Sequence, residues 1–186
     1  VFGLHSVNAL AAYEWNTYTG TTQESQKSGF SSGFEVFDAA AVPRKIAGSQ
    51  SEWAVQSFLL NANYAYDNKY LFQASFRRDG ASNFGDDAKY GNFFSLSGGW
   101  NINREAFFTA DWVDQLKLRV SYGSVGNRPT ALYPQYALYS AEKYNENPGG
   151  LIFQVANPDL TWEKTFTTGV GIDATFFNRV NITVDY

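Results

Sequence analysis

Four oxygen-bearing side chains lie close together in one turn-rich segment of this sequence, R-R-D-G-A-S-N-F-G-D-D at residues 77–87. They are Asp79, Asn83, Asp86 and Asp87, and clustered carboxylate and amide oxygens are the ligands that Ca²⁺ prefers. The spacing is not that of an EF-hand loop, and no glutamate follows at the bidentate position. We therefore favour a solvated turn over a calcium site.

A second candidate for chemistry is the carboxylate pair Asp159 and Glu163, which flanks Trp162 in the segment D-L-T-W-E. Two carboxylates beside an aromatic ring on which a sugar can stack suggest glycoside hydrolysis. Residues four apart on a strand share a face, but hydrolysis also requires that both carboxylates face a pocket at a defined separation. The start of a strand with solvated charges is the simpler interpretation.

The remaining composition excludes several classes of site. The chain has no cysteine, so it offers no disulfide, thiol nucleophile or thiolate ligand, and its one histidine, His5, cannot form a two-histidine metal site. No glycine-rich segment matches the phosphate-binding loop. The net charge of −4 argues against a nucleic-acid partner, which usually requires a basic stripe. We expect no metal, no cofactor, no catalytic residue and no nucleic acid.

The elements that position these residues are predicted to be strands. In K-Y-L-F-Q-A-S-F-R at residues 69–77, apolar and polar side chains alternate, and the same pattern returns in L-K-L-R-V-S-Y at residues 116–122. Alternation with period two is typical of a strand with one apolar face. It places Lys117, Arg119 and Asp173 on polar faces, where they can contact a solute or pair with one another.

About seven strands are expected in all, with the last one truncated. Their predicted ranges are 4–18, 52–66, 69–77, 90–103, 115–124, 160–177 and 180–186. Single helical turns are expected at 35–41 and at 104–113, the second capped by Asn103. The tight turns Asp67-Asn68 and Asn178-Arg179 alternate with long connections at residues 19–51, 79–89 and 125–158. Three tyrosines of the last connection, Tyr133, Tyr136 and Tyr139, suit both ligand contact and loop packing.

Composition and connection lengths together favour a membrane barrel. Aromatic residues make up 18% of the chain, yet no apolar run approaches the roughly 18 residues of a membrane helix. Alternating strands, aromatic residues near the short turns and long loops at the opposite end are typical of outer-membrane barrels. No signal-peptide pattern is present, and strand patterns occur at both ends, so we expect a piece of a longer protein.

Several segments together resemble the SusC/RagA family of TonB-dependent outer-membrane transporters from Bacteroidetes-type bacteria. The resemblance covers most of residues 67–186, whereas the first 66 residues match more loosely. The segments that carry it are D-N-K-Y-L-F-Q-A-S-F-R-R-D-G-A-S-N-F-G (67–85), Y-G-N-F-F-S-L-S-G-G-W-N-I-N-R-E-A-F-F (90–108), L-K-L-R-V-S-Y-G-S-V-G-N (116–127), N-P-D-L-T-W-E-K-T (157–165) and G-V-G-I-D-A-T-F-F-N-R-V-N-I-T-V-D-Y (169–186).

The resemblance implies an all-β, antiparallel, up-and-down transmembrane barrel of about 22 strands, of which residues 1–186 supply part of one barrel domain. The plug domain and the remaining strands are expected outside this chain. The resemblance also implies location in the outer membrane and import of oligosaccharides or peptides. Its implied partners are a SusD-like surface lipoprotein, TonB acting through other parts of the full-length protein, and the lipid bilayer.

Two other readings stay open at this point. A soluble β-sandwich could use exposed aromatic residues to bind glycans. A β-rich glycosidase could use Asp159 and Glu163, although no nucleophile, base and orienting group converge in the sequence.

Overall fold

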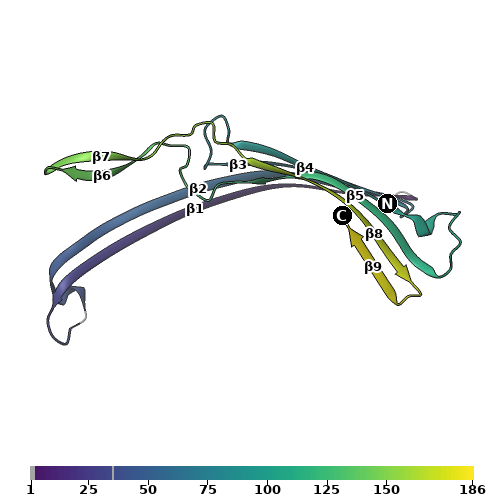
Figure 1. The fold of residues 1–186 in the computed structure, drawn as a ribbon, viewed down its shortest axis with the longest axis horizontal. Helices are drawn as coiled ribbons and strands as arrows, with labels where there is room; N and C mark the ends of the chain where they lie inside the picture. The colour runs from purple at the N-terminus through teal and green to yellow at the C-terminus, as the bar shows by residue number, and fades with distance from the viewer. Residues whose placement is uncertain (1–2, 35) are drawn as a thin grey trace.

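The computed structural model describes residues 3–34 and 36–186, and most of them form one antiparallel sheet (Figure 1). The sheet has seven strands, and each lies beside its neighbour in sequence except where β5 pairs with β8. A separate two-stranded hairpin, β6 (Leu138–Tyr144) with β7 (Asn147–Gln154), lies in the connection between them. The strands of the main sheet are β1 (His5–Phe30), β2 (Ala40–Tyr66), β3 (Tyr70–Ala81), β4 (Tyr90–Asn101), β5 (Val113–Asn127), β8 (Glu163–Phe176) and β9 (Val180–Asp185).

The register of the sheet separates an apolar face from a polar face. Tyr64, Phe72 and Gly98 are aligned across β2, β3 and β4 on one face, and Asn63, Gln73 and Ser97 are aligned on the other. Alternate side chains of each strand therefore gather with others of their kind. This arrangement confirms the all-β, antiparallel fold and the alternation predicted from the sequence.

The apolar face is not covered by any other described part of the chain. Phe58, Phe72, Leu118 and Ile172 are 43%, 56%, 37% and 46% exposed. A β-sandwich would bury such residues against a second sheet. The sandwich interpretation is therefore wrong for the part of the chain that the structure describes.

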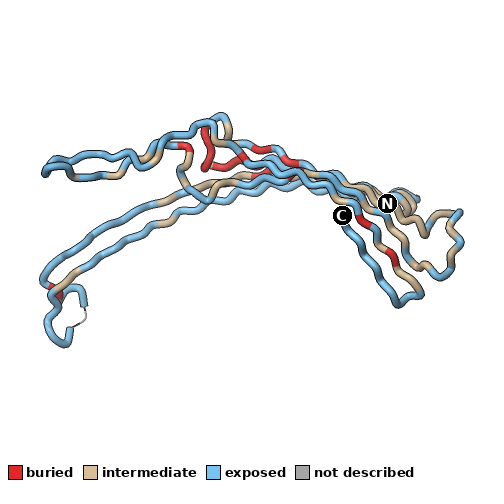
Figure 2. The backbone as a smooth tube through the Cα atoms, in the orientation of Figure 1, coloured by how far each residue is buried: buried red, intermediate tan, exposed pale blue. Residues whose placement is uncertain are grey.

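Buried residues are few, and most lie where β3 and β4 meet the connections on the side away from the tight turns (Figure 2). The one apolar cluster among the described residues consists of Ala81, Phe84, Phe93 and Trp162, with Val55 and Leu160 packed against it. Its members come from β3, β4 and the two connections that follow β3 and precede β8. The cluster fixes these connections to the sheet.

At the other end, two hairpins close through tight turns in the left-handed backbone region. Asp67 and Asn68 have φ of +50° and +51°, and Phe177 and Asn178 both have φ of +53°. Two consecutive residues with positive φ form the type I′ turn, whose twist matches that of the flanking strands. Aromatic pairs lie beside these turns, including Tyr66 with Tyr70 and Trp112 with Phe177.

The predicted connection at residues 19–51 is largely strand. β1 and β2 remain paired from His5–Tyr66 to Phe30–Ala40, with one irregularity at Gln26 and Lys27. The predicted connection at residues 125–158 likewise contains the last residues of β5 and the β6–β7 hairpin. The first segment was expected to be a loop because it is polar, and the second because it contains several prolines and a Gly-Gly pair. Backbone pairing nevertheless extends into parts of both.

The remaining differences are local. The short helix η1 (Phe37–Ala39) confirms the predicted turn, whose first residue, Glu35, lies outside the described residues. The helix η2 (Ile102–Arg104) begins earlier than predicted, and Asn103 lies within it instead of capping it. The Asn103 side chain contacts β5: its amide donates to the Asp114 carbonyl, and its oxygen accepts a hydrogen bond from the Leu116 amide. Among the described residues, no helix has the length and apolarity needed to cross a membrane.

Candidate functional site: the polar face and the long-loop rim

The polar face carries rows of small and amide side chains across five strands. Asn8, Asn63, Gln73, Ser97 and Ser121 are consecutive partners in the register of β1 to β5. Together with Lys117 and Arg119 they line a hollow of about 540 Å³. The amide and hydroxyl side chains of the hollow thus offer hydrogen-bond donors and acceptors, and Lys117 and Arg119 add two cations.

Arg119 connects three strands on this face. Its Nε and Nη2 donate to the two carboxylate oxygens of Asp173 at 2.7 and 3.0 Å, and Nη2 also donates to Asp185 at 2.8 Å. Gly171 is the register partner of Arg119, and a Cβ there would lie 2.8 Å from Nη2. Glycine therefore leaves room for the guanidinium to lie against the sheet.

Of the three residues predicted to face the interior, Arg119 and Asp173 form an ion pair, and Lys117 is the register partner of Asp173. All three belong to the same polar face. Asp185 completes the network. The sequence analysis did not single it out, although alternation along β9 places it on the same face as Asn181 and Thr183.

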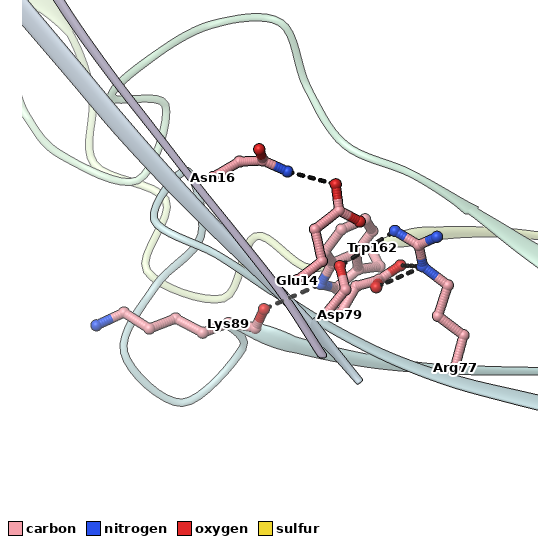
Figure 3. A network of polar contacts seen from close by, with 7 residues as sticks. Glu14, Asn16, Arg77, Asp79, Lys89 and Trp162 are labelled. Carbon is pink, nitrogen blue, oxygen red and sulfur yellow. Dashed lines mark hydrogen bonds and ion pairs between the residues drawn. The ribbon is translucent and has the colours of Figure 1, made fainter. Parts of the chain in front are cut away.

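A polar network lies beside the buried cluster (Figure 3). The Arg77 guanidinium contacts the Asp79 carboxylate at 2.6 Å and donates to Ser57 Oγ at 3.1 Å. The indole of Trp162 donates to the Lys89 carbonyl at 3.0 Å. These bonds satisfy polar groups where the connections cross the sheet.

The longest connection is fixed to the sheet by a second set of polar contacts. Asn83 is fully buried, its amide donates to the Ala131 carbonyl at 2.6 Å, and its oxygen accepts from Arg128 at 3.1 Å. The Arg128 guanidinium also lies 4.7 Å from the centre of the Trp53 ring, and Gln135 donates to the Ser82 carbonyl. We did not predict the roles of Arg128 and Gln135, because their partners are more than forty residues away in sequence.

Three of the four candidate calcium ligands have separate partners. Asp79 pairs with Arg77, Asn83 is used by Ala131 and Arg128, and Asp86 pairs with Lys89 at 2.5 Å. The hydrogen bond from Lys89 holds the pKa of Asp86 below its usual value. Within residues 3–34 and 36–186, no group of three carboxylate, histidine or cysteine side chains is placed to hold a metal ion.

The candidate glycosidase pair is not arranged for catalysis. Asp159 lies in a turn, and Glu163 is the first residue of β8, so the two do not share a strand. Trp162 is 8% exposed and packs against Phe84 and Phe93, which removes its ring from contact with a sugar. The idea that Trp162 offers a stacking surface is wrong.

The three candidate tyrosines have different surroundings. Tyr133 accepts a hydrogen bond from the Glu52 amide at 3.0 Å and thereby holds the connection against β2. Tyr136 and Tyr139 are 56% and 66% exposed, and Tyr139 lies on β6. Their rings are therefore accessible on the long-loop side of the sheet.

The sequence of this chain is similar to a known protein family and to several curated proteins. The family model described as TonB dependent receptor-like, beta-barrel matches residues 1–186. Among curated relatives, TonB-dependent receptor P39 of Formosa agariphila is 39% identical over 135 residues, which is 71% of this chain and 13% of that protein. TonB-dependent receptor SusC of Bacteroides thetaiotaomicron is 29% identical over 190 residues, which is 92% of this chain and 19% of that protein.

Solved structures give the same result. The structure of the RagAB peptide transporter matches all of this chain with a TM-score of 0.91 and 28% identity, over 21% of its own length. The RagAB peptide importer in the 'open-open' state matches 97% of this chain with a TM-score of 0.79 and 29% identity, over 20% of its own length. The chain therefore spans about a fifth of these proteins.

The matches and the geometry agree. The sheet has an exposed apolar face, a polar face, tight turns at one end and long connections at the other, as the wall of an outer-membrane barrel requires. The chain is part of a multi-pass protein of the outer membrane. It belongs to the TonB-dependent receptor-like β-barrel family.

Proposed function

We propose that this chain is a wall segment of an outer-membrane transporter that imports oligosaccharides or peptides with energy supplied through TonB. The observation that carries the proposal is the similarity of the whole sheet to the RagAB peptide transporter, at a TM-score of 0.91. The chain spans about a fifth of that structure, so the plug and the remaining strands belong to the rest of a longer protein. Residues 1–186 then form part of one barrel domain.

The two faces of the sheet have separate roles in this proposal. The apolar face contacts the hydrocarbon of the bilayer, and the polar face lines a hydrated interior. Lys117, Arg119 and Asp173 lie on the interior wall, where the Arg119 network keeps its charges mutually neutralised. A hydrated wall of this kind allows a polar solute to pass without binding tightly to one charge.

We assign contact with the substrate, or with a lipoprotein that covers it, to the long-loop rim. This rim is the part of the connection at residues 125–158 that carries Tyr136 and Tyr139. Tyr136 and Tyr139 present exposed rings there, and tyrosine combines apolar area with a polar tip. The partner of this rim is a SusD-like surface lipoprotein that closes over the captured substrate. The substrate is released inward by an energy-coupled movement of the plug, without chemical change, so the chain acts as a transporter and not as an enzyme.

Deleting the full-length gene in the native bacterium tests the transport function. The deletion strain is expected to lose growth on one oligosaccharide or peptide mixture as the sole nutrient. Deleting TonB or the SusD-like lipoprotein is expected to have the same effect. Unchanged growth and uptake on every oligosaccharide and peptide mixture would overturn the proposal.

The role of the rim needs its own variant. Replacing Tyr136 and Tyr139 together by alanine in the full-length protein is expected to reduce uptake at low substrate concentration. Tyr144→Ala is the matched control, because Tyr144 is also exposed and lies at the turn of the same hairpin. Equal uptake by the double variant and the control would remove these tyrosines from the site.

A further inference from the structure

The apolar face contains a hollow that its neighbours do not fill. The hollow has a volume of about 670 Å³ and crosses β1 to β5. Three small residues, Ala62, Ala74 and Gly98, lie along it on three adjacent strands. Larger side chains border it on both sides, namely Tyr64 and Phe72 toward the tight turns and Leu96 and Tyr122 toward the long connections.

The packing of the sheet does not require glycine at position 98. A Cβ built on Gly98 would meet only Val120, at 3.5 Å, which is ordinary van der Waals contact. Gly98 also has no positive φ. Glycine inside a strand weakens it and often marks a bulge, a tight bend or a place where a ligand or another backbone approaches closely. β4 pairs with β3 and β5 without a register shift, so Gly98 does not mark a bulge. The open space above Gly98 therefore points to an occupant from outside the sheet.

The position of the hollow restricts what that occupant is. It lies one to two same-face residues from the aromatic row of Tyr66, Tyr70 and Trp100, roughly 7–14 Å along the strands. One leaflet of the hydrocarbon core is about 15 Å deep. The hollow thus lies in the leaflet next to the tight turns and is continuous with the face that contacts lipid.

We infer that this hollow holds one acyl chain of a phospholipid from that leaflet. The hollow crosses five strands, which corresponds to about 19 Å at the usual spacing between neighbouring strands, long enough for an extended hydrocarbon chain. The exposed surface of the hollow is almost wholly apolar, although Asn63, Gln73, Ser97 and Ser121 also border it. Such a surface suits a hydrocarbon chain better than a polar ligand. Lipid tails are as apolar as the hollow, so retention comes from close contact with the bordering side chains and not from the hydrophobic effect.

The test uses the full-length protein in nanodiscs that contain a phosphatidylethanolamine with a photoactivatable group on one acyl chain. After irradiation, mass spectrometry locates the cross-links. They are expected to be enriched several-fold on the strand segments around Ala62, Ala74 and Gly98 compared with the neighbouring row of Leu60 and Phe76. This comparison within the wild-type protein does not depend on any substitution.

Variants then fill the hollow. Gly98→Leu and Ala74→Leu are each expected to lower the cross-linking there to the level of the rest of the face. Ala11→Leu is the matched control, because Ala11 is exposed on the same face but does not line the hollow. Cross-links spread evenly along the apolar face would overturn the inference.

Discussion

Arg119 forms two ion pairs on the polar face, one with Asp173 and one with Asp185. It contacts carboxylates from β8 and β9, and the side chains of Arg119, Asp173 and Asp185 are 36%, 26% and 62% exposed. Exposed ion pairs contribute little, but a guanidinium that binds one carboxylate through two nitrogens is among the stronger cases. Its removal also leaves two carboxylates facing each other.

Arg119→Met is expected to lower the urea midpoint of unfolding. The combined variant Arg119→Met, Asp173→Asn, Asp185→Asn should recover most of that loss, because it removes the unpaired charges as well. Urea unfolding of the full-length protein in detergent, followed by gel mobility, measures both values. If the single and the combined variants unfold at the same urea concentration, Arg119 does not act through this network.

Glu105 provides a pH-dependent contact at the end of the sheet with the tight turns. Its carboxylate accepts hydrogen bonds from Tyr70 Oη at 2.6 Å and Trp100 Nε1 at 3.0 Å. These bonds, that from Tyr70 most of all, hold the pKa of Glu105 below its ordinary value of 4.5. A lowered folded-state pKa means that the contribution to stability is complete above the unfolded value and is lost as the pH falls through the folded value.

We therefore expect the wild-type protein to be more stable than Glu105→Gln at pH 6 and to lose that advantage below about pH 4.5. The glutamine keeps an oxygen acceptor but has no charge, so the comparison isolates ionisation. Unfolding midpoints measured between pH 3 and pH 6 for both proteins provide the test. Parallel curves over that range would show that ionisation of Glu105 does not stabilise the fold.

Single residues also show where the sequence stops being informative. Lys117, Arg119 and Asp173 could be assigned to a polar face because alternation alone decides the direction of a strand side chain. Trp162 could not be assigned, because its burial depends on Phe84 and Phe93, which other segments bring to it. The same holds for Gln135, whose partner Ser82 lies in a different connection.

At the scale of elements, the alternating strands were predictable and the polar ones were not. β3 and β5 were recognised from their apolar faces, with ends displaced by a few residues. The far half of β1 reads T-G-T-T-Q-E-S-Q-K-S-G-F, which is polar on both faces and has no period for a sequence analysis to detect. β7 contains Pro148, Gly149 and Gly150, which usually indicate a loop.

The β2–β3 turn offers a direct test of an element. Asn68 has φ of +51°, a conformation that asparagine tolerates and β-branched residues do not. Asn68→Gly is expected to leave stability unchanged or slightly higher, whereas Asn68→Val should destabilise the full-length barrel by about 1–2 kcal/mol. Folding yield and urea midpoint in detergent distinguish the two variants, and equal values would contradict the type I′ assignment.

At the scale of the whole molecule, the sheet is an open wall, and β1 and β9 are its outermost strands among the described residues. Unpaired backbone groups cannot face hydrocarbon, so a membrane sheet must continue until it closes. A single sheet buries few side chains. The apolar face is therefore covered by lipid and not by a second layer of protein. The proposed transport role therefore depends on which face of the sheet meets the bilayer.

Cysteine scanning of β3 measures this most directly. Single cysteines at residues 72–77 of the full-length protein, in an otherwise cysteine-free background, are treated in outer-membrane vesicles with a water-soluble maleimide. Positions 73, 75 and 77 are expected to react, while positions 72, 74 and 76 react only with a lipid-soluble reagent. The opposite pattern, in which positions 72, 74 and 76 react with the water-soluble reagent and positions 73, 75 and 77 do not, would contradict the assignment of the apolar face to lipid. Reaction without any alternation would contradict it as well.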